Sequence, residues 1–217
     1  MSLVALALRS GNGTPVFLVH GVGGTALCYR ELALRLPRPC FGIEARGIDG
    51  QEAPLDCVEA LAAAYLDEIR AQGAPGSWLL GGWSFGGLVA FEMSVQLSRA
   101  GLPVGAALLD SRGLGERSAG EAPPMEGAPL RGLRATQAAH VTALARYRPG
   151  RTTAPLLVVR ATETPGAADP SLGFDALAGG RLETMAVRAA HEGLLLPPAV
   201  DIVAGALVGF FAKWDRG

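Results

Sequence analysis

The clearest chemical signal in the sequence lies at residues 81–87, which read GGWSFGG and contain the pattern Gly-x-Ser-x-Gly. The pattern alone is weak, because a chain with 30 glycines is expected to contain it by chance roughly 0.2 times. Its position strengthens it, since a predicted strand ends at Gly81 and a predicted buried helix begins at Phe85. Glycines two residues before and after Ser84 allow a sharp strand-to-helix turn that exposes the hydroxyl. We predict that Ser84 is a nucleophile; the alternative is a glycine-rich packing turn.

A serine hydroxyl is a good nucleophile only when a base takes its proton, and the chain has 3 histidines. His191 follows the last predicted strand and precedes the final predicted helix, where the base falls in the order serine, acid, histidine. We predict that His191 is the base. His20 opens the turn after an early strand and is expected to be structural. His140 lies within a predicted helix, where a packed or solvated side chain is expected.

The base needs a carboxylate that holds its tautomer and stabilises the imidazolium. Asp110 ends the predicted strand that follows the helix after Ser84, and we predict that it is this acid. Glu163 and Asp169 follow the next predicted strand and remain competitors. An aspartate at a strand end can also serve only as a cap.

The reaction would also need two backbone N–H groups that hold an oxyanion. Phe85 offers one, because it follows the nucleophile at a helix N-terminus, where amides are free and the helix dipole favours an anion. Val22 offers the other, in a turn of small residues that follows a strand and His20.

The same turn has a second interpretation. Residues 21–26 read GVGGTA and match a dinucleotide-binding fingerprint, with Glu44 at the end of the following predicted strand. We favour the oxyanion interpretation, because the nucleotide interpretation does not account for Ser84, Asp110 and His191.

The elements that must position these residues alternate between strands and helices. This order predicts an α/β fold, a mostly parallel sheet flanked by helices. Apolar runs predict strands at 4–8, 16–20, 40–44, 77–81, 104–109, 155–160 and 181–187. Apolar residues at helical spacing predict helices at 28–36, 57–71, 85–100, 135–147 and 197–213. Residues 112–133 are rich in Gly, Pro and charge and lack periodicity, which predicts a lid or binding loop.

Composition narrows the class of protein. A length of 217 residues with 49% hydrophobic side chains predicts a single domain over 1–217. The net charge of −1 argues against a nucleic-acid binder. Three cysteines without paired spacing predict neither a disulfide framework nor a zinc site. The lack of an apolar span or leader-like N-terminus predicts no membrane partner and a cytoplasmic location. The lack of heptads favours a monomer.

Several segments resemble the thioesterase domains that end nonribosomal peptide synthetases and related polyketide synthases. The similarity covers nearly the whole chain outside 112–133. It rests on FLVHG at 17–21, FGIEARGIDG at 41–50, GWSFGGLVAFEM at 82–93, LLDS at 108–111, residues 140–149 and HEGLL at 191–195. Trp83 and the AFEM run at 90–93 favour the terminal domain over the stand-alone editing type. In this family the acid follows the strand after the elbow helix, which supports Asp110 over Asp169.

The resemblance implies an α/β-hydrolase fold with 112–133 as a short lid. It also implies an activity: release of an acyl or peptidyl chain from the phosphopantetheine of a carrier protein through an acyl-Ser84 ester. His191 and Asp110 would assist, and the Val22 and Phe85 amides would hold the oxyanion. Release would be by hydrolysis or by ring closure. The enzyme itself would use no metal or cofactor, because the phosphopantetheine belongs to the partner.

Four alternatives remain open from the sequence. An editing thioesterase or a small-ester carboxylesterase would use the same fold and the same residues. A non-catalytic or nucleotide-binding module would not need the complete set of Ser84, Asp110 and His191.

Overall fold

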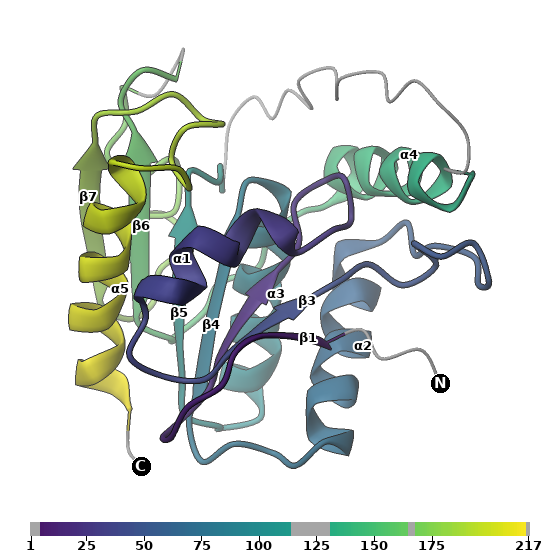
Figure 1. The fold of residues 1–217 in the computed structure, drawn as a ribbon, viewed down its shortest axis with the longest axis horizontal. Helices are drawn as coiled ribbons and strands as arrows, with labels where there is room; N and C mark the ends of the chain where they lie inside the picture. The colour runs from purple at the N-terminus through teal and green to yellow at the C-terminus, as the bar shows by residue number, and fades with distance from the viewer. Residues whose placement is uncertain (1–4, 114–130, 165–167, 216–217) are drawn as a thin grey trace.

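The computed structural model describes residues 5–113, 131–164 and 168–215. These residues form one sheet with the strand order β1-β3-β2-β4-β5-β6-β7 (Figure 1). Only β1 is antiparallel to its neighbour. The strands are β1 (Ala5–Arg9), β2 (Val16–Val19), β3 (Cys40–Ile43), β4 (Trp78–Trp83), β5 (Val104–Leu109), β6 (Leu156–Ala161) and β7 (Leu182–Val187). The predicted mostly parallel α/β sheet is confirmed.

Helices cover both faces of this sheet. The α2 helix (Val58–Ala71) and the α3 helix (Phe85–Arg99) pack on one face, where their buried residues share a core cluster with the strands. The opposite face is covered by the 3-10 turn η1 (Leu27–Tyr29), α1 (Arg30–Arg35) and α5 (Ala199–Trp214). The α4 helix (Arg131–Arg146) lies across one end of the molecule in Figure 1.

The inner strands β2, β4 and β5 carry no charged or polar aliphatic side chain, because each face of the sheet is covered. In β5, Ala106 and Leu108 belong to the core cluster under α2 and α3, whereas Ala107 and Leu109 belong to the cluster under α1 and α5. This alternation is the two-residue period of a strand. A strand that is buried on both faces has a continuous apolar run in its sequence. The apolar run at 104–109 predicted β5 in this way.

The parallel strands place their carboxyl ends at one edge of the sheet. The ends of β2, β4, β5 and β6 are neighbours in the strand order, so the residues that follow each strand gather there. In open α/β sheets this edge is where ligands bind. The β4 strand continues to Trp83, two residues beyond its predicted end, so the turn into α3 consists of Ser84 alone.

The α4 helix corrects part of the predicted lid. It begins at Arg131, four residues before the predicted helix, so 131–133 are helical. The buried residues of its first turns are Gly132, Thr136 and His140, which are small or polar and therefore invisible to an apolar period. Of the predicted lid, residues 114–130 lie outside the described residues.

The remaining boundaries differ from prediction by one or two residues, with one local correction. The final helix begins at Ala199, two residues after its predicted start at 197, with Pro198 as its N-cap. None of the helices in the described part of the chain has the length and apolar character of a membrane span.

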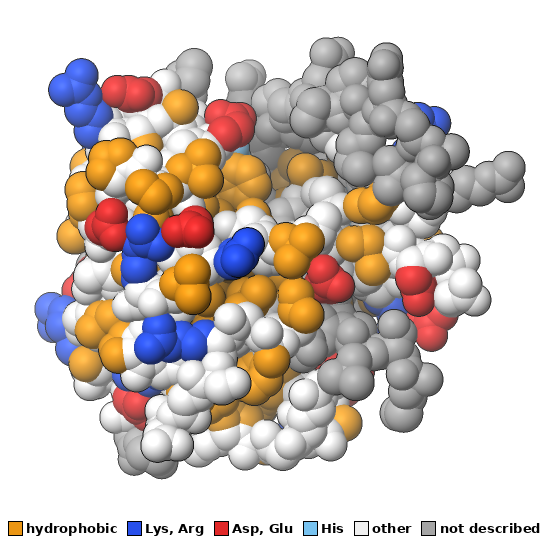
Figure 2. Space-filling view, viewed as in Figure 1, with side chains coloured by type: hydrophobic (Ala, Val, Ile, Leu, Met, Phe, Trp, Pro, Cys, Tyr) orange, Lys and Arg blue, Asp and Glu red, His pale blue; other side chains and the backbone are white. Residues whose placement is uncertain are grey.

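Figure 2 shows the face covered by α1 and α5, on which apolar and charged side chains are mixed. The exposed apolar side chains of this region include Leu34 and Ile202. Arg35 forms an ion pair with Asp201 of α5 and another with Glu31 of its own helix.

Candidate active site

Ser84 occupies a strained turn between β4 and α3. Its φ of 57° lies in the region that non-glycine residues seldom adopt, and such residues cluster at active sites. The glycines on either side are sterically required. A Cβ on Gly82 would lie 2.2 Å from the Gly86 backbone, and one on Gly86 would lie 2.2 Å from the Val19 carbonyl oxygen. The predicted need for small residues two before and two after Ser84 is therefore met by backbone contact.

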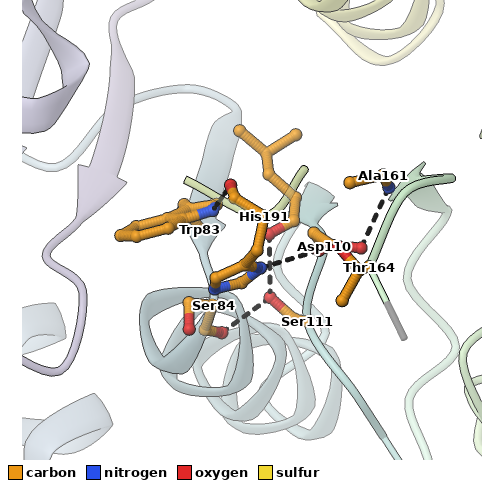
Figure 3. A network of polar contacts seen from close by, with 8 residues as sticks. Trp83, Ser84, Asp110, Ser111, Ala161, Thr164 and His191 are labelled. Carbon is orange, nitrogen blue, oxygen red and sulfur yellow. Dashed lines mark hydrogen bonds and ion pairs between the residues drawn. The ribbon is translucent and has the colours of Figure 1, made fainter. Parts of the chain in front are cut away.

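His191 and Asp110 come together from loops 81 residues apart in the sequence. The distance between His191 Nδ1 and Asp110 Oδ2 is 2.7 Å. The ring turns its other nitrogen toward Ser84 (Figure 3). Asp110 is buried, whereas a quarter of the His191 side chain is exposed. The structure thus brings the three predicted residues to one place, in the order that a nucleophile, a base and an acid require.

Asp110 is surrounded by hydrogen-bond donors. Its Oδ1 accepts a bond from the Ala161 N–H at 2.9 Å, and its Oδ2 accepts a bond from the Thr164 hydroxyl at 3.0 Å. Burial by itself would raise the pKa of Asp110, but the bonds from His191, Ala161 and Thr164 outweigh it and lower the pKa below its usual value. The carboxylate therefore stays ionised and can stabilise a protonated His191.

The two competing carboxylates have other partners. Glu163 forms an exposed ion pair with Arg188. Asp169 accepts bonds from the Ser171 amide and hydroxyl and from the Gly173 amide. The geometry thus favours Asp110 as the carboxylate that orients His191.

Trp83 holds His191 in a way that the sequence did not reveal. The indole ring stacks on the imidazole with centroids 4.6 Å apart, and its Nε1–H donates to the His191 carbonyl oxygen at 3.1 Å. The Trp83 amide in turn donates to the Tyr29 hydroxyl at 2.7 Å. The residue before the nucleophile therefore positions the base. Trp83 is part of the motif at 81–87, but the motif does not indicate which residue its side chain will contact.

The Phe85 amide is held through its own peptide group. The Ser111 hydroxyl donates to the Ser84 carbonyl oxygen at 2.7 Å (Figure 3). A trans peptide is planar, so a bond to its oxygen also fixes the direction of the N–H at the other end. The N-terminal amides of a helix lack intrahelical partners, which leaves the Phe85 N–H available to an anion. Ser111 directly follows Asp110, but its position in the sequence did not predict the bond to the Ser84 carbonyl oxygen.

The turn that carries Val22 lies against α4. A Cβ on Gly24 would lie 2.9 Å from Thr136 Cγ2, and the His140 Nδ1 lies 2.8 Å from the Val22 carbonyl oxygen. The side chains of α4 therefore fill the space directly beside this turn. Val22 itself is half-buried.

His20 and His140 are both fully buried, so His140 is packed rather than solvated. His20 Nε2 lies 2.6 Å from the Tyr65 hydroxyl oxygen. Burial lowers the pKa of His20 to about 3 and that of His140 to about 4. Both rings are therefore neutral at neutral pH.

No group of three or more His, Cys, Asp or Glu side chains within the described ranges is arranged to hold a metal ion.

Comparison with known proteins agrees with this arrangement. A family model described as "Thioesterase domain" matches residues 14–156. Polyketide synthase PksR of Bacillus subtilis (strain 168) is 39% identical over 100 residues, which are 46% of this chain and 4% of that protein. The chain thus spans a small part of the length of this relative.

Solved structures extend the similarity over almost the whole chain. Holo-AB3403, a four-domain nonribosomal peptide synthetase bound to AMP and glycine, matches 96% of this chain and 20% of its own, with a TM-score of 0.84 and 24% identity. The NocB thioesterase domain in covalent complex with a fluorophosphonate nocardicin G analog matches 93% of this chain and 96% of its own, with a TM-score of 0.72 and 25% identity.

The strained serine turn and the Asp110–His191 pair thus occur in a chain whose sequence and fold both match those of thioesterase domains. The chain is homologous to the release domains of nonribosomal peptide and polyketide synthases. It belongs to the thioesterase domain family, whose members are serine hydrolases with the α/β-hydrolase fold.

Proposed function

We propose that residues 1–217 act as one thioesterase domain that releases an acyl or peptidyl chain from the phosphopantetheine of a carrier protein. The observation that carries the proposal is the 2.7 Å contact between His191 Nδ1 and Asp110 Oδ2 beside the strained Ser84. The similarity to multidomain polyketide and nonribosomal peptide synthases supports a carrier protein as the partner.

In the first half-reaction the Ser84 hydroxyl attacks the thioester carbonyl carbon, and His191 takes the hydroxyl proton. The carbonyl oxygen becomes an oxyanion that accepts bonds from the Val22 and Phe85 amides. When the tetrahedral intermediate collapses, the carbon–sulfur bond breaks and the thiol leaves with the proton from His191. The product is an ester of the acyl chain with Ser84.

In the second half-reaction His191 activates the acceptor. Water gives a free acid, whereas a hydroxyl or amine within the bound chain gives a ring. The ester bond breaks, and the proton returns to Ser84 through His191. Asp110 keeps the Nδ1 proton of His191 in place throughout, so that Nε2 faces the reacting atoms. The steps use side chains and amides of this chain, and the phosphopantetheine enters with the substrate.

The test is intact-protein mass spectrometry after the chain is mixed with an acyl-phosphopantetheinyl carrier protein. We expect the wild type to gain the acyl mass on Ser84, and Ser84→Ala to gain none. The matched control is Ser10→Ala, which removes an exposed hydroxyl and should acylate as the wild type does. Analysis of the released product then separates hydrolysis from ring closure.

Other outcomes would overturn the proposal in distinct ways. Cleavage of small aryl esters without turnover of several acyl carriers would identify an esterase. Rapid release of short mis-loaded acyl groups alone would identify an editing thioesterase. An acyl mass on both wild type and Ser84→Ala would place the nucleophile elsewhere.

A further inference from the structure

The turn that presents the Val22 amide has little conformational restraint of its own. Gly21, Gly23 and Gly24 surround Val22, and glycine adopts many backbone conformations at low cost. A Cβ on Gly23 would meet nothing within 4 Å, so close packing does not hold that residue. One bond within the turn, from the Gly24 N–H to the Gly21 carbonyl oxygen, restrains this peptide group, and contacts from outside the turn add to it.

His20 provides one such contact. Its Nδ1 lies 2.7 Å from the Gly21 carbonyl oxygen, which also accepts the Gly24 amide at 3.0 Å. The Gly21 carbonyl and the Val22 N–H belong to the same planar peptide group and point in opposite directions. The ring therefore holds one end of the peptide whose other end is the proposed oxyanion donor.

His140 provides the second contact, from the α4 helix 118 residues away. Its Nδ1 lies 2.8 Å from the Val22 carbonyl oxygen. This oxygen belongs to the next peptide group, so the two histidines hold both peptide planes that meet at the Val22 Cα. The two rings also stack on each other, with centroids 4.7 Å apart and planes 15° apart.

The same histidine touches the other half of the oxyanion site. The Phe85 ring stacks on His140 with centroids 4.8 Å apart and planes 22° apart. Phe85 begins α3 and carries the second proposed donor. His140 thus contacts both residues whose amides are proposed to bind the oxyanion.

The hydrogen-bonding chemistry defines the tautomer of each ring. A carbonyl oxygen only accepts, so His20 and His140 must each carry a proton on Nδ1. The Tyr65 hydroxyl then donates to the unprotonated Nε2 of His20. Because burial lowers the pKa of both rings, each has this single proton at neutral pH.

From this geometry we propose that His20 and His140 are positioning residues that set the direction of the Val22 N–H for the oxyanion. The inference rests on the proposed function, in which Val22 is an oxyanion donor. The arrangement parallels that at Phe85, where the Ser111 hydroxyl holds the carbonyl of the same peptide group.

The test uses two substitutions of His140 with opposite losses. His140→Phe keeps a ring that can stack on Phe85 and His20 but removes the Nδ1–H. His140→Asn loses the ring but places an amide N–H where Nδ1 was. The readouts are kcat and KM for a p-nitrophenyl ester and the rate at which an alkyl fluorophosphonate labels Ser84, which forms a phosphoryl oxyanion at the same site.

We expect His140→Phe to lower kcat and the labelling rate by about 10- to 100-fold, less than the loss expected when a donor is removed outright. The value of KM should change little, because the bond matters only when the oxyanion forms. His140→Asn should recover most of the rate. Unchanged labelling of His140→Phe, or equal losses in both variants, would overturn the proposal in favour of simple packing.

Two controls keep the result decisive. If the wild type is not labelled at Ser84, the proposed function fails first; if Ser84 is labelled and His140→Phe reacts at the wild-type rate, only the positioning role fails. Should His140→Phe not fold, nitrogen-15 NMR of histidine-labelled wild type decides. With 3 histidines in the chain, each ring can be assigned, and an Nε2–H tautomer of His140 at neutral pH would refute the proposed bond.

Discussion

At the scale of single residues, the proposed catalytic groups are all held by a second set of donors and acceptors. Asp110 accepts bonds from Ala161 and Thr164 as well as His191. Trp83 stacks on the His191 ring and bonds its carbonyl. Such support keeps catalytic side chains in a productive geometry without reorganisation during the reaction.

Asp110→Asn tests the identity of the acid. An amide at this position can donate to Nδ1 and so favours the wrong tautomer of His191, with its Nε2 protonated and unable to act as a base. We expect kcat for ester or thioester cleavage to fall by about 10³- to 10⁴-fold, with folding retained. Steady-state kinetics with circular dichroism as the folding check measures this.

The control for that substitution is Glu163→Gln, at the competing carboxylate. Glu163 is exposed and pairs with Arg188, so its loss should change kcat by less than about twofold, as is usual for surface substitutions. A large loss in Glu163→Gln with little effect of Asp110→Asn would reassign the acid.

At the scale of elements, the junction of β4 and α3 is the most constrained part of the fold. The helix begins directly after Ser84 and passes so close to the end of β2 that backbone oxygens occupy the space of a side chain at Gly86. The Val19 and His20 oxygens lie 2.2 and 2.4 Å from where a Cβ would be. These are backbone atoms, so they cannot move aside as a flexible side chain could.

Gly86→Ala is therefore expected to be strongly destabilising, by about 3 kcal/mol or more, the upper end for overpacking. Urea unfolding of the purified variant measures this loss. The matched control is Gly209→Ala in α5, where a Cβ meets nothing within 4 Å and alanine should stabilise the helix by about 0.5–1 kcal/mol. Similar unfolding midpoints for the two variants would show that the elbow tolerates a side chain.

At the scale of the whole molecule, the α4 helix packs against the segments that follow the neighbouring strands β2 and β3. It contacts the turn after β2 through Thr136 and His140. It also passes close to residues 48–50, since a Cβ on Gly132 would lie 2.5 Å from the Ile48 carbonyl oxygen. The buried His20 and His140 between these elements make the stability of the fold depend on pH.

The sign of this dependence follows from the lowered pKa values. Unfolded histidines bind protons below pH 6.5, whereas in the folded state the pKa of His20 is about 3 and that of His140 is about 4. Between pH 6.5 and 4 the unfolded state binds more protons, so stability falls as pH falls. In this range each histidine lowers the free energy of unfolding by up to about 1.4 kcal/mol per pH unit of acidification. Above pH 6.5 neither histidine makes the free energy of unfolding depend on pH.

Urea unfolding of wild type and His140→Phe across pH 4.5–7 checks this prediction. We expect the wild type to lose stability steeply as the solution is acidified, and the variant to show about half that slope, because one of the two histidines is gone. Parallel curves would mean that His140 binds its proton equally in both states.

Much of the fold and of the candidate site was readable from local signals. The Gly-x-Ser-x-Gly pattern marked the elbow, because a tight strand-to-helix turn requires glycines beside it. The positions of Asp110 and His191 just after strands were informative, because parallel strands bring their carboxyl ends to one edge. The apolar runs located the inner strands for the same reason that makes them strands, burial on both faces.

The tertiary structure alone decided how these residues are held. The contact between His140 and Val22 joins positions 118 apart, and that between Ser111 and Ser84 joins positions 27 apart. A histidine in a helix carries no local mark of the carbonyl it will meet. The start of α4 was missed for a related reason, since its buried face is made of Gly132, Thr136 and His140. Sequence spacing determines which residues reach the catalytic edge, whereas packing between distant segments determines the direction in which their polar atoms point.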